Sequence, residues 1–324
     1  MANESGPAEL LRFQALNRLL GNIDIRPNAN HCFYHPPDGR WSPVPWDLDM
    51  MFIPKTHQAG FVDQVRCLDV PALSREYKNR GREILDLFCA DSSTNGGQFG
   101  QLVDELARTL CPPGRERTWP ELDQAMWNWH PRSNARGMFY QNPCEDWRQG
   151  GGWKRTLATA DFAGFCKYLD EFCTDARPVK NYQPNDGDQR GYGFGYLWWE
   201  TKDEKIPARP TVRHAGPAAF RTNELTFQVS PFASPQGSNQ FAAVQWRVGE
   251  ISAPGLAGYV EGKPRRYEIE ECWRSEELHQ PASEFRLPPG ACRASHTHRV
   301  RARYLDNTGR WSHWSEPVQF VAEK

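Results

Sequence analysis

Four polar side chains near the start of the sequence have the types and spacing of a metal site: Asp24, Asn30, Asp47 and Asp49. Between them lies Asp38-Gly39, a dipeptide that favours a two-residue type I′ hairpin turn. With that turn, the residue numbers of each opposed pair sum to 77. Asn30 and Asp47 therefore face each other, with Cβ atoms about 5 Å apart. Two such oxygen ligands suit Mg²⁺ or Mn²⁺.

A helix must precede this hairpin to position Asp24. Ser5 is a suitable cap, Pro7 fits the first turn, and leucines and Phe13 form an apolar stripe. Gly21-Asn22 is a suitable stop, since both residues tolerate the left-handed conformation. Asp24 therefore lies in the loop directly after the helix. Pro43 and Pro45 cannot donate to a ladder, so the second strand of the hairpin is expected to be an edge or irregular.

Composition excludes some classes of protein. The chain has 324 residues, a net charge of −1 and ordinary apolar content of 39%. Near-neutral charge argues against nucleic acid as a partner, and the sequence has no run of 18 apolar residues that would predict a membrane span. Nine cysteines is an odd number, so at least one thiol is unpaired within the chain.

The pattern of apolar residues divides the chain into helical and extended parts. Residues 65–174 are predicted to be mainly helical, with helices opening at Ser74, at the capping box Thr118–Glu121, and at Thr159 or Asp161. Residues 177–195 are predicted to be loop. After a linker at 206–221, the pattern alternates with period two, which predicts strands within residues 225–232, 241–250, 265–273, 283–288, 298–306 and 316–323.

The last strands carry arginines and tryptophans at regular spacing. The arginines alternate along one face of a predicted strand, and the two tryptophans lie three apart after the next turn, so that they can interleave as a cation–π ladder. This ladder is either a surface that docks a partner or a brace on the exterior of the domain. Its residues are Arg299, Arg301, Arg303, Trp311 and Trp314.

The strands from residue 222 onward resemble a fibronectin type III-like module. FAAVQWRV is similar to its central strand C and HRVRARYLD to its strand F, while WSHWS matches the WSxWS signature of cytokine-receptor members of that fold. One position departs from the pattern, because His298 stands where the corner tyrosine of the fold is expected. The resemblance implies a β-sandwich that serves binding or spacing.

The first 200 residues resemble the CotH-type spore-coat kinases, a family of atypical protein kinases. LLGNIDIRPNANHCFYH and GRWSPVPWDLDMMF carry the resemblance. It implies that Asp24 orients or deprotonates the attacking hydroxyl, and that Asn30 and Asp47 hold Mg²⁺ on the phosphates of ATP. Asp49 is an additional ligand or a supporting partner, and Asn28 is an alternative to Asn30.

The resemblance also implies a small lobe ahead of the catalytic loop, with a lysine that pairs the phosphates. The first lysine of this sequence is Lys55, which follows Asp24. The sequence is therefore interpreted as a large-lobe portion without its small lobe, and we expect no phosphate transfer at a useful rate by this chain alone. The residues that would bind the nucleotide stay unassigned.

The sequence thus predicts an α+β protein with a mainly helical, kinase large-lobe-like domain at 1–205, a linker at 206–221 and a sandwich at 222–324. Its expected function is phosphate transfer from Mg-ATP to Ser/Thr of surface or coat proteins. One alternative is a non-catalytic surface-binding or scaffold protein. Another is a glycosyltransferase that uses Asp47-Leu48-Asp49 as a DxD motif, for which parallel strands would be expected. The family resemblance suggests an exported or cell-surface location.

Overall fold

The computed structural model describes residues 7–25, 32–35, 42–46, 48, 51–52, 68–89, 97–127, 129–130, 135–136, 145–146, 151–152, 157–174, 193–235, 237 and 239–324. Its contacts form two compact units that each draw on separate stretches of the chain. One unit consists of Glu4–Leu73 and Ser92–Glu200, and the other of Met1–Asn3, Ser74–Asp91 and Thr201–Lys324. Helices dominate the first and antiparallel sheets the second, so the predicted mixture of helices and strands is confirmed at this level.

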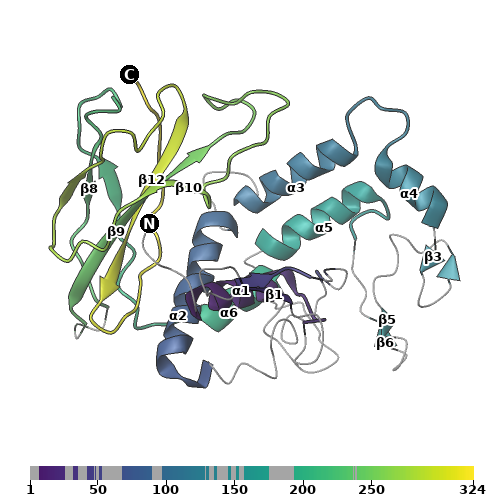
Figure 1. The fold of residues 1–324 in the computed structure, drawn as a ribbon, viewed down its shortest axis with the longest axis horizontal. Coiled ribbons are helices and arrows are strands. Elements are labelled where there is room, and N and C mark those ends of the chain that lie inside the picture. Colours follow the sequence, from purple (N-terminus) through teal and green to yellow (C-terminus); the bar gives the residue numbers. More distant parts are fainter. Residues whose placement is uncertain are drawn as a thin grey trace. The chain divides into compact units, whose positions relative to one another are not determined.

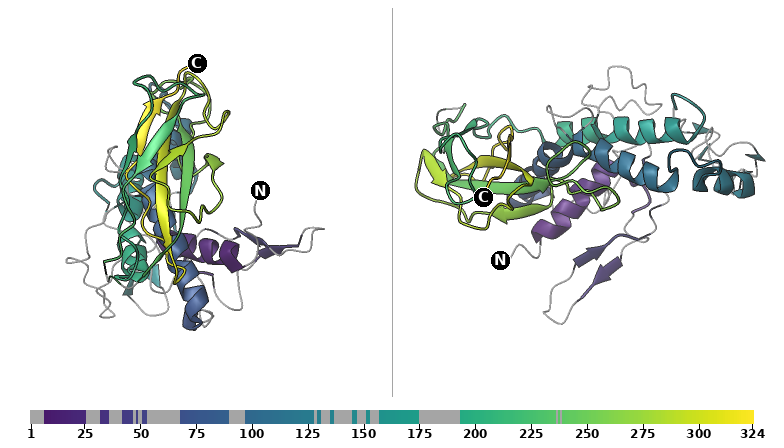
Figure 2. Two further views of the ribbon diagram at one scale, coloured as in Figure 1. Left: turned by 90° about the vertical axis from the view of Figure 1, so that its left-hand side faces the viewer. Right: turned by 90° about the horizontal axis from the view of Figure 1, so that it is seen from above.

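The first unit is built from helices with short strand pairs between them. Helices α3 and α5 lie side by side (Figure 1), and β1 and β2 form a two-stranded ribbon beside α1 (Figure 2). The elements are α1 (Pro7–Leu20), β1 (Cys32–Tyr34), β2 (Ser42–Val44), α3 (Gly97–Leu110), α4 (Trp119–Trp127), β3 (Trp129–His130), β4 (Ala135–Arg136), β5 (Glu145–Asp146), β6 (Gly151–Gly152), α5 (Phe162–Thr174) and α6 (Gly193–Thr201).

Local capping signals located several helix starts correctly. The Thr118 N–H donates to Glu121 Oε2 at 2.9 Å before α4, as the predicted capping box requires. The Gly164 N–H donates to Asp161 Oδ1 at 2.7 Å at the start of α5. The predicted start at Ser74 is wrong, because that helix begins at Pro71, where a missing N–H costs nothing. The sequence did not predict α6, because its two glycines end a stretch rich in Gly, Pro and Asn that favours a loop.

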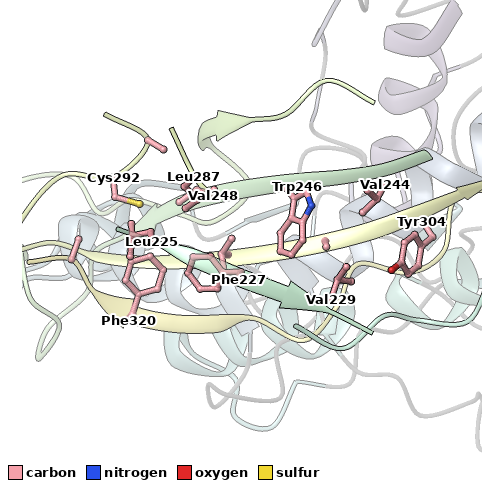
Figure 3. Close-up of a cluster of buried hydrophobic side chains, with 14 residues drawn as sticks. Leu225, Phe227, Val229, Val244, Trp246, Val248, Leu287, Cys292, Tyr304 and Phe320 are labelled. Atoms are coloured by element: carbon pink, nitrogen blue, oxygen red, sulfur yellow. The ribbon is translucent and has the colours of Figure 1, made fainter. Parts of the chain in front are cut away.

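The second unit holds two antiparallel sheets that share one hydrophobic core. The four-stranded sheet has the order β10-β9-β12-β13 and the three-stranded sheet the order β11-β8-β7. Side chains from both sheets meet between them (Figure 3), including Phe227, Trp246 and Val248, which are at most 1% exposed. The strands are β7 (Val212–His214), β8 (Thr226–Val229), β9 (Phe241–Ile251), β10 (Glu271–Arg274), β11 (Glu284–Arg286), β12 (Thr297–Asp306) and β13 (Val318–Val321).

Two features of this unit differ from the sequence analysis. Strand β7 lies inside the range predicted as a linker, since prolines on both sides of it conceal a three-residue strand. Near the start of β12, His298, which stands where a tyrosine was expected, forms contacts of its own. Its Nε2 accepts the Arg293 N–H at 3.1 Å and its Nδ1 lies 3.0 Å from His296 O. Burial lowers the pKa of His298, which favours the neutral ring that this pattern requires.

The outer face of the four-stranded sheet buries charge. Glu268 is fully buried, and its carboxylate accepts hydrogen bonds from Arg299 and Arg301 and lies 3.5 Å from Arg247 Nη1. Burial by itself would raise the pKa of Glu268, but the guanidinium groups, Arg301 foremost, hold it below its usual value. Gly249 permits this close approach, because a Cβ there would lie 2.8 Å from Glu268 O. Complementary charge thus replaces apolar packing on this face.

A helix from the first part of the chain also belongs to this unit. Helix α2 (Pro71–Ile84) continues without a break into the π-helix η4 (Leu85–Cys89). Four polar residues recur at the spacing of one helix face: Asn79, Arg82, Glu83 and Asp86. All four are buried. The helix therefore packs on the sheet unit through a polar stripe.

This stripe binds the backbone of the WSHWS segment. Asn79 Oδ1 accepts the Trp311 N–H at 3.1 Å, and Asp86 Oδ2 accepts the Trp314 N–H at 2.9 Å. Arg82 donates to the carbonyl oxygens of Thr201 and Trp311 at 2.9 and 3.3 Å. Each of these groups would be left without a partner in an apolar environment if the helix were removed, so the helix is part of the fold of this unit.

Glu268→Gln is expected to lower the free energy of unfolding of the sheet unit by about 3–5 kcal/mol, because it removes the charge of a buried carboxylate that three buried arginines share. Urea denaturation followed by tryptophan fluorescence measures this loss. The matched control is Glu284→Gln, an exposed carboxylate, which should change the free energy of unfolding by less than about 0.5 kcal/mol. Equal effects of the two substitutions would contradict the structural role of Glu268.

The effect of Glu268→Gln should also depend on pH. The pKa of Glu268 is lower in the folded state, so its contribution is complete above the unfolded value of about 4.3 and is lost as the pH falls through the folded value. We therefore expect the difference in stability between the two proteins to be full at pH 7 and to shrink below about pH 4.3. A difference that stays constant down to pH 3 would argue that shape, and not charge, causes the loss.

Asp86→Ala is expected to destabilise the same unit by about 1–3 kcal/mol, because the buried Trp314 N–H loses its acceptor. Hydrogen–deuterium exchange should rise across residues 79–89. Asp104→Ala is the control: it removes an exposed carboxylate that pairs with Arg108 within α3, a contact worth about 0.3–0.5 kcal/mol. Unchanged exchange in 79–89 after Asp86→Ala would show that the helix is held by other contacts.

Candidate functional site

The loop that carries Asp24 is fixed by the end of α1. The helix ends at Leu20, and Gly21 follows with φ +59°, the left-handed conformation expected at this stop. Asn22 is fully buried: its backbone N–H donates to Asn17 O and its Nδ2 to Asn17 Oδ1, both at 3.1 Å. Asn22 Oδ1 in turn accepts the Asp24 N–H at 3.3 Å. The predicted helix stop is therefore confirmed, and the asparagine also locks the path of the loop.

Burial alternates along this loop. Ile23 and Ile25 are 3% and 2% exposed, whereas Asp24 between them is partly exposed. The two isoleucines anchor the backbone in the core of the unit. A carboxylate held between two such anchors keeps contact with solvent while its backbone is immobilised, which is an arrangement that suits a group acting on a ligand.

Phe52 brings the chain back to the C-terminal end of α1. Its N–H donates to Leu20 O at 2.6 Å, and its carbonyl oxygen accepts the Tyr168 hydroxyl at 2.8 Å. Its ring meets that of Phe172 edge to face with a centroid distance of 5.7 Å. Phe52 also has φ +57°, an uncommon value for a residue with a side chain. The structure thus joins Phe52 both to the end of α1 and to α5, contacts that the sequence analysis did not predict.

The predicted register of the hairpin is wrong by one residue. Tyr34 pairs with Ser42 and Phe33 with Pro43, so the paired numbers sum to 76 and not to 77. A two-residue turn at Asp38-Gly39 would make Pro37 part of the closing pair, and Pro37 has no N–H for one of its two hydrogen bonds. Opposition of Asn30 and Asp47 therefore does not follow from the register. The strands are antiparallel, as a hairpin requires.

The predicted metal ligands lie outside the described residues. These are Asn30, Asp47 and Asp49, together with the alternative Asn28. Among the residues that the structure describes, no group of three or more His, Cys, Asp or Glu side chains could hold a metal ion. Convergence of Asn30 and Asp47 on Asp24 therefore stays a prediction.

Within the second predicted site, Arg303 stacks on both tryptophans, and the three side chains are buried. The Arg303 guanidinium carbon lies 4.2 Å from the centre of the Trp311 ring and 4.4 Å from that of Trp314. Arg247 follows on the other side at 5.7 Å from the Trp314 ring. Gln245 Oε1 accepts two hydrogen bonds from Arg303, at 3.1 and 2.7 Å. Burial lowers the pKa of Arg303 to about 10.

The remaining residues of the predicted ladder have partners within the same unit. Arg299 and Arg301 bind Glu268, and Arg301 also donates to Ser315 O at 2.7 Å. The serines of the WSHWS segment bond to β12, where Ser312 Oγ accepts the Tyr304 N–H at 3.0 Å. The stripe of α2 and η4 contacts this segment in turn. In this chain the ladder therefore docks the chain's own helix.

Sequence reasoning missed the partners of this ladder. Glu268 lies before β10 in a stretch predicted to be an alternating strand, and Asn79 and Asp86 lie on a helix predicted only from its apolar side. One signal was available: the polar residues of the helix repeat with the spacing 79, 82, 83 and 86, which is that of a buried helix face. No helix in the described part of the chain is long and apolar enough to cross a membrane.

Comparisons with known proteins give one informative match. No curated protein matches the chain. A solved structure titled "Myokine structure" aligns with 37% of this chain and 98% of its own at 15% identity, but its TM-score of 0.22 is too low to carry an argument. Residues 8–92 match the family model described as "CotH kinase protein". This match includes α1, the Asp24 loop, the hairpin and the helix α2–η4, and it suggests a kinase-like function for that part of the chain.

Proposed function

We propose that residues 8–92 contribute the phosphate-transfer site of a CotH-like atypical protein kinase. The observation that carries this proposal is the family match, which spans the helix stop, the Asp24 loop and the acidic segment before Phe52. The closure of that segment by the Leu20–Phe52 hydrogen bond adds support, because it returns the chain after the WDLD segment to the base of the Asp24 loop. The proposed substrates are ATP and Ser/Thr hydroxyls of a surface or coat protein.

In this proposal, each polar residue has one role. Asp24 accepts the proton of the attacking hydroxyl and orients its oxygen toward the phosphorus. Asn30 and Asp47 hold Mg²⁺, and Asp49 assists as an additional or supporting ligand; amide and carboxylate oxygens are the donors that this ion prefers. The bound metal neutralises charge on the phosphates. The partial exposure of Asp24 and its anchored backbone support its role as the positioned base.

We propose that the sheet unit is a fibronectin type III-like module that serves binding or spacing. Its division into a three-stranded and a four-stranded antiparallel sheet around one core supports this assignment, with β7 as the first strand. The module would attach the kinase-like part to a surface partner. No side chain of the sheet unit has been assigned a catalytic role.

A non-catalytic binding or scaffold protein is the second candidate. The observation that favours it is the unit of two antiparallel sheets around one core, an architecture that commonly serves binding. A DxD glycosyltransferase is disfavoured, because β1 and β2 pair antiparallel and that alternative expects parallel strands.

The metal site can be tested without relying on activity. Titration of the purified chain with Mn²⁺ in the presence of ATP, followed by electron paramagnetic resonance, should detect one bound ion. Asp47→Asn should weaken its affinity at least tenfold, because losing even an indirect partner of a metal ligand costs about 10–100-fold. Asp38→Asn, which neutralises another acid of the same segment, is the matched control and should leave the affinity unchanged.

Equal weakening by Asp38→Asn and Asp47→Asn would refute the assigned ligands, and no bound Mn²⁺ would favour the scaffold candidate. Incubation with radiolabelled Mg-ATP tests the transfer itself. Transfer that is abolished by Asp47→Ala would support the kinase assignment.

A further inference from the structure

One pair of cysteines in the sheet unit has no role in the proposed site. Cys272 lies on β10 at an irregularity in the pairing with β9: Glu271 pairs with Gly249 and Trp273 with Val248, so Cys272 is the extra residue of a bulge. The bulge turns its side chain toward the chain segment that precedes β12. Its Sγ lies 3.3 Å from Ala291 O, and the residue is exposed.

Cys292 is the residue directly after that carbonyl. It is 8% exposed and belongs to the hydrophobic core of the unit, where Figure 3 draws its sulfur near Leu287 and Val248. In a planar trans peptide the carbonyl oxygen lies roughly 2.8 Å from the next Cα, so Cys272 Sγ is within about 6 Å of Cys292 Cα. This distance joins a sulfur to a Cα, whereas a disulfide needs the two sulfurs to approach to about 2.05 Å, so the bond requires the two side chains to rotate toward each other.

We propose that Cys272 and Cys292 are a disulfide-forming pair, and that a small-molecule disulfide such as oxidised glutathione closes this bond. The Cys272 thiolate attacks one sulfur of the oxidant, forms a mixed disulfide and releases one reduced glutathione. The Cys292 thiolate then attacks Cys272 Sγ and expels the second glutathione. The two cysteines lose two electrons and two protons in total, and the oxidant gains both electrons. Cys272 reacts first because it is the exposed member of the pair.

The bond would connect an edge strand of one sheet to the chain segment between β11 and β12. β10 is an edge strand of the four-stranded sheet, paired on one side with β9. Cys292 lies in the connection between β11 of the other sheet and β12. A cross-link would close a loop of about 20 residues and so reduce the freedom of the unfolded chain. It would also hold the edge strand against pairing with other molecules.

The surroundings of the thiols predict how the reaction depends on pH. Burial raises the pKa of Cys272, and burial together with the nearby Cys272 raises the pKa of Cys292 to about 12. The thiolate is the reactive form, so its fraction grows about tenfold for each pH unit below the pKa. We expect cross-linking to be slow at pH 7 and about ten times faster at pH 8.

The test uses the full 324-residue chain, incubated with oxidised glutathione or with dithiothreitol. Free thiols are blocked with N-ethylmaleimide in denaturant, and the protein is digested and analysed by mass spectrometry without reduction. The expected product is a peptide pair joined through Cys272 and Cys292 in the oxidised sample alone, with a higher midpoint of thermal unfolding. Cys272→Ser and Cys292→Ser should each abolish both effects, whereas Cys166→Ser should abolish neither.

Three results would overturn the proposal. The first is that Cys272 and Cys292 both carry N-ethylmaleimide after incubation with the oxidant, in protein whose circular dichroism spectrum remains that of the folded state. The second is a majority of cross-links from either residue to some other cysteine. The third is a mixed disulfide of Cys272 with glutathione that never resolves. If Cys292→Ser fails to fold, the peptide analysis of the unmutated chain and of Cys272→Ser decides the question.

Discussion

The burial of the Arg303 guanidinium is the constraint on which the sheet unit depends. A charged group away from water is tolerated only when its hydrogen bonds and its charge are matched. Gln245 on β9 accepts two of its N–H groups, Trp311 and Trp314 cover its two faces, and Glu83 of α2 lies 3.7 Å from it. These partners come from three separate stretches of the chain. Sheet, WSHWS segment and helix must therefore assemble together for the cation to be stable.

This requirement explains why the compact units do not follow the order of the sequence. The family match ends at residue 92, and its last helix is the one that packs on the sheet unit. A boundary drawn at the end of the match would separate Asn79 and Asp86 from the backbone N–H groups of Trp311 and Trp314, whose hydrogen bonds they accept. The kinase-like segment and the sheet unit thus share a structural element, although they differ in fold class and in the function that we propose.

The proposed catalytic loop follows a different principle, in which apolar anchors position a polar group. Asn22 satisfies the backbone around the end of α1, and two buried isoleucines fix the residues on either side of Asp24. Phe52 then brings the chain back to Leu20 through a single backbone bond. Positioning of this kind does not require a charged group to be buried, and it leaves the Asp24 carboxylate partly exposed. Such an arrangement suits a residue that acts on a ligand.

Local sequence signals determined the helix stop at Gly21 and the capped helices α4 and α5, because these depend on neighbours within a few residues. They also determined most strands of the sheet unit and the cation–π stacking of Arg303, because these depend on one alternating face of a strand. Tertiary structure decided the rest. The β1–β2 register is defined by the pairing of the two strands and differs from the one that the turn dipeptide predicted, and strand β7 is defined by its pairing with β8. The burial of the ladder depends on a helix more than 200 residues away in the chain, and no local pattern specifies which distant carboxylate will meet a given arginine.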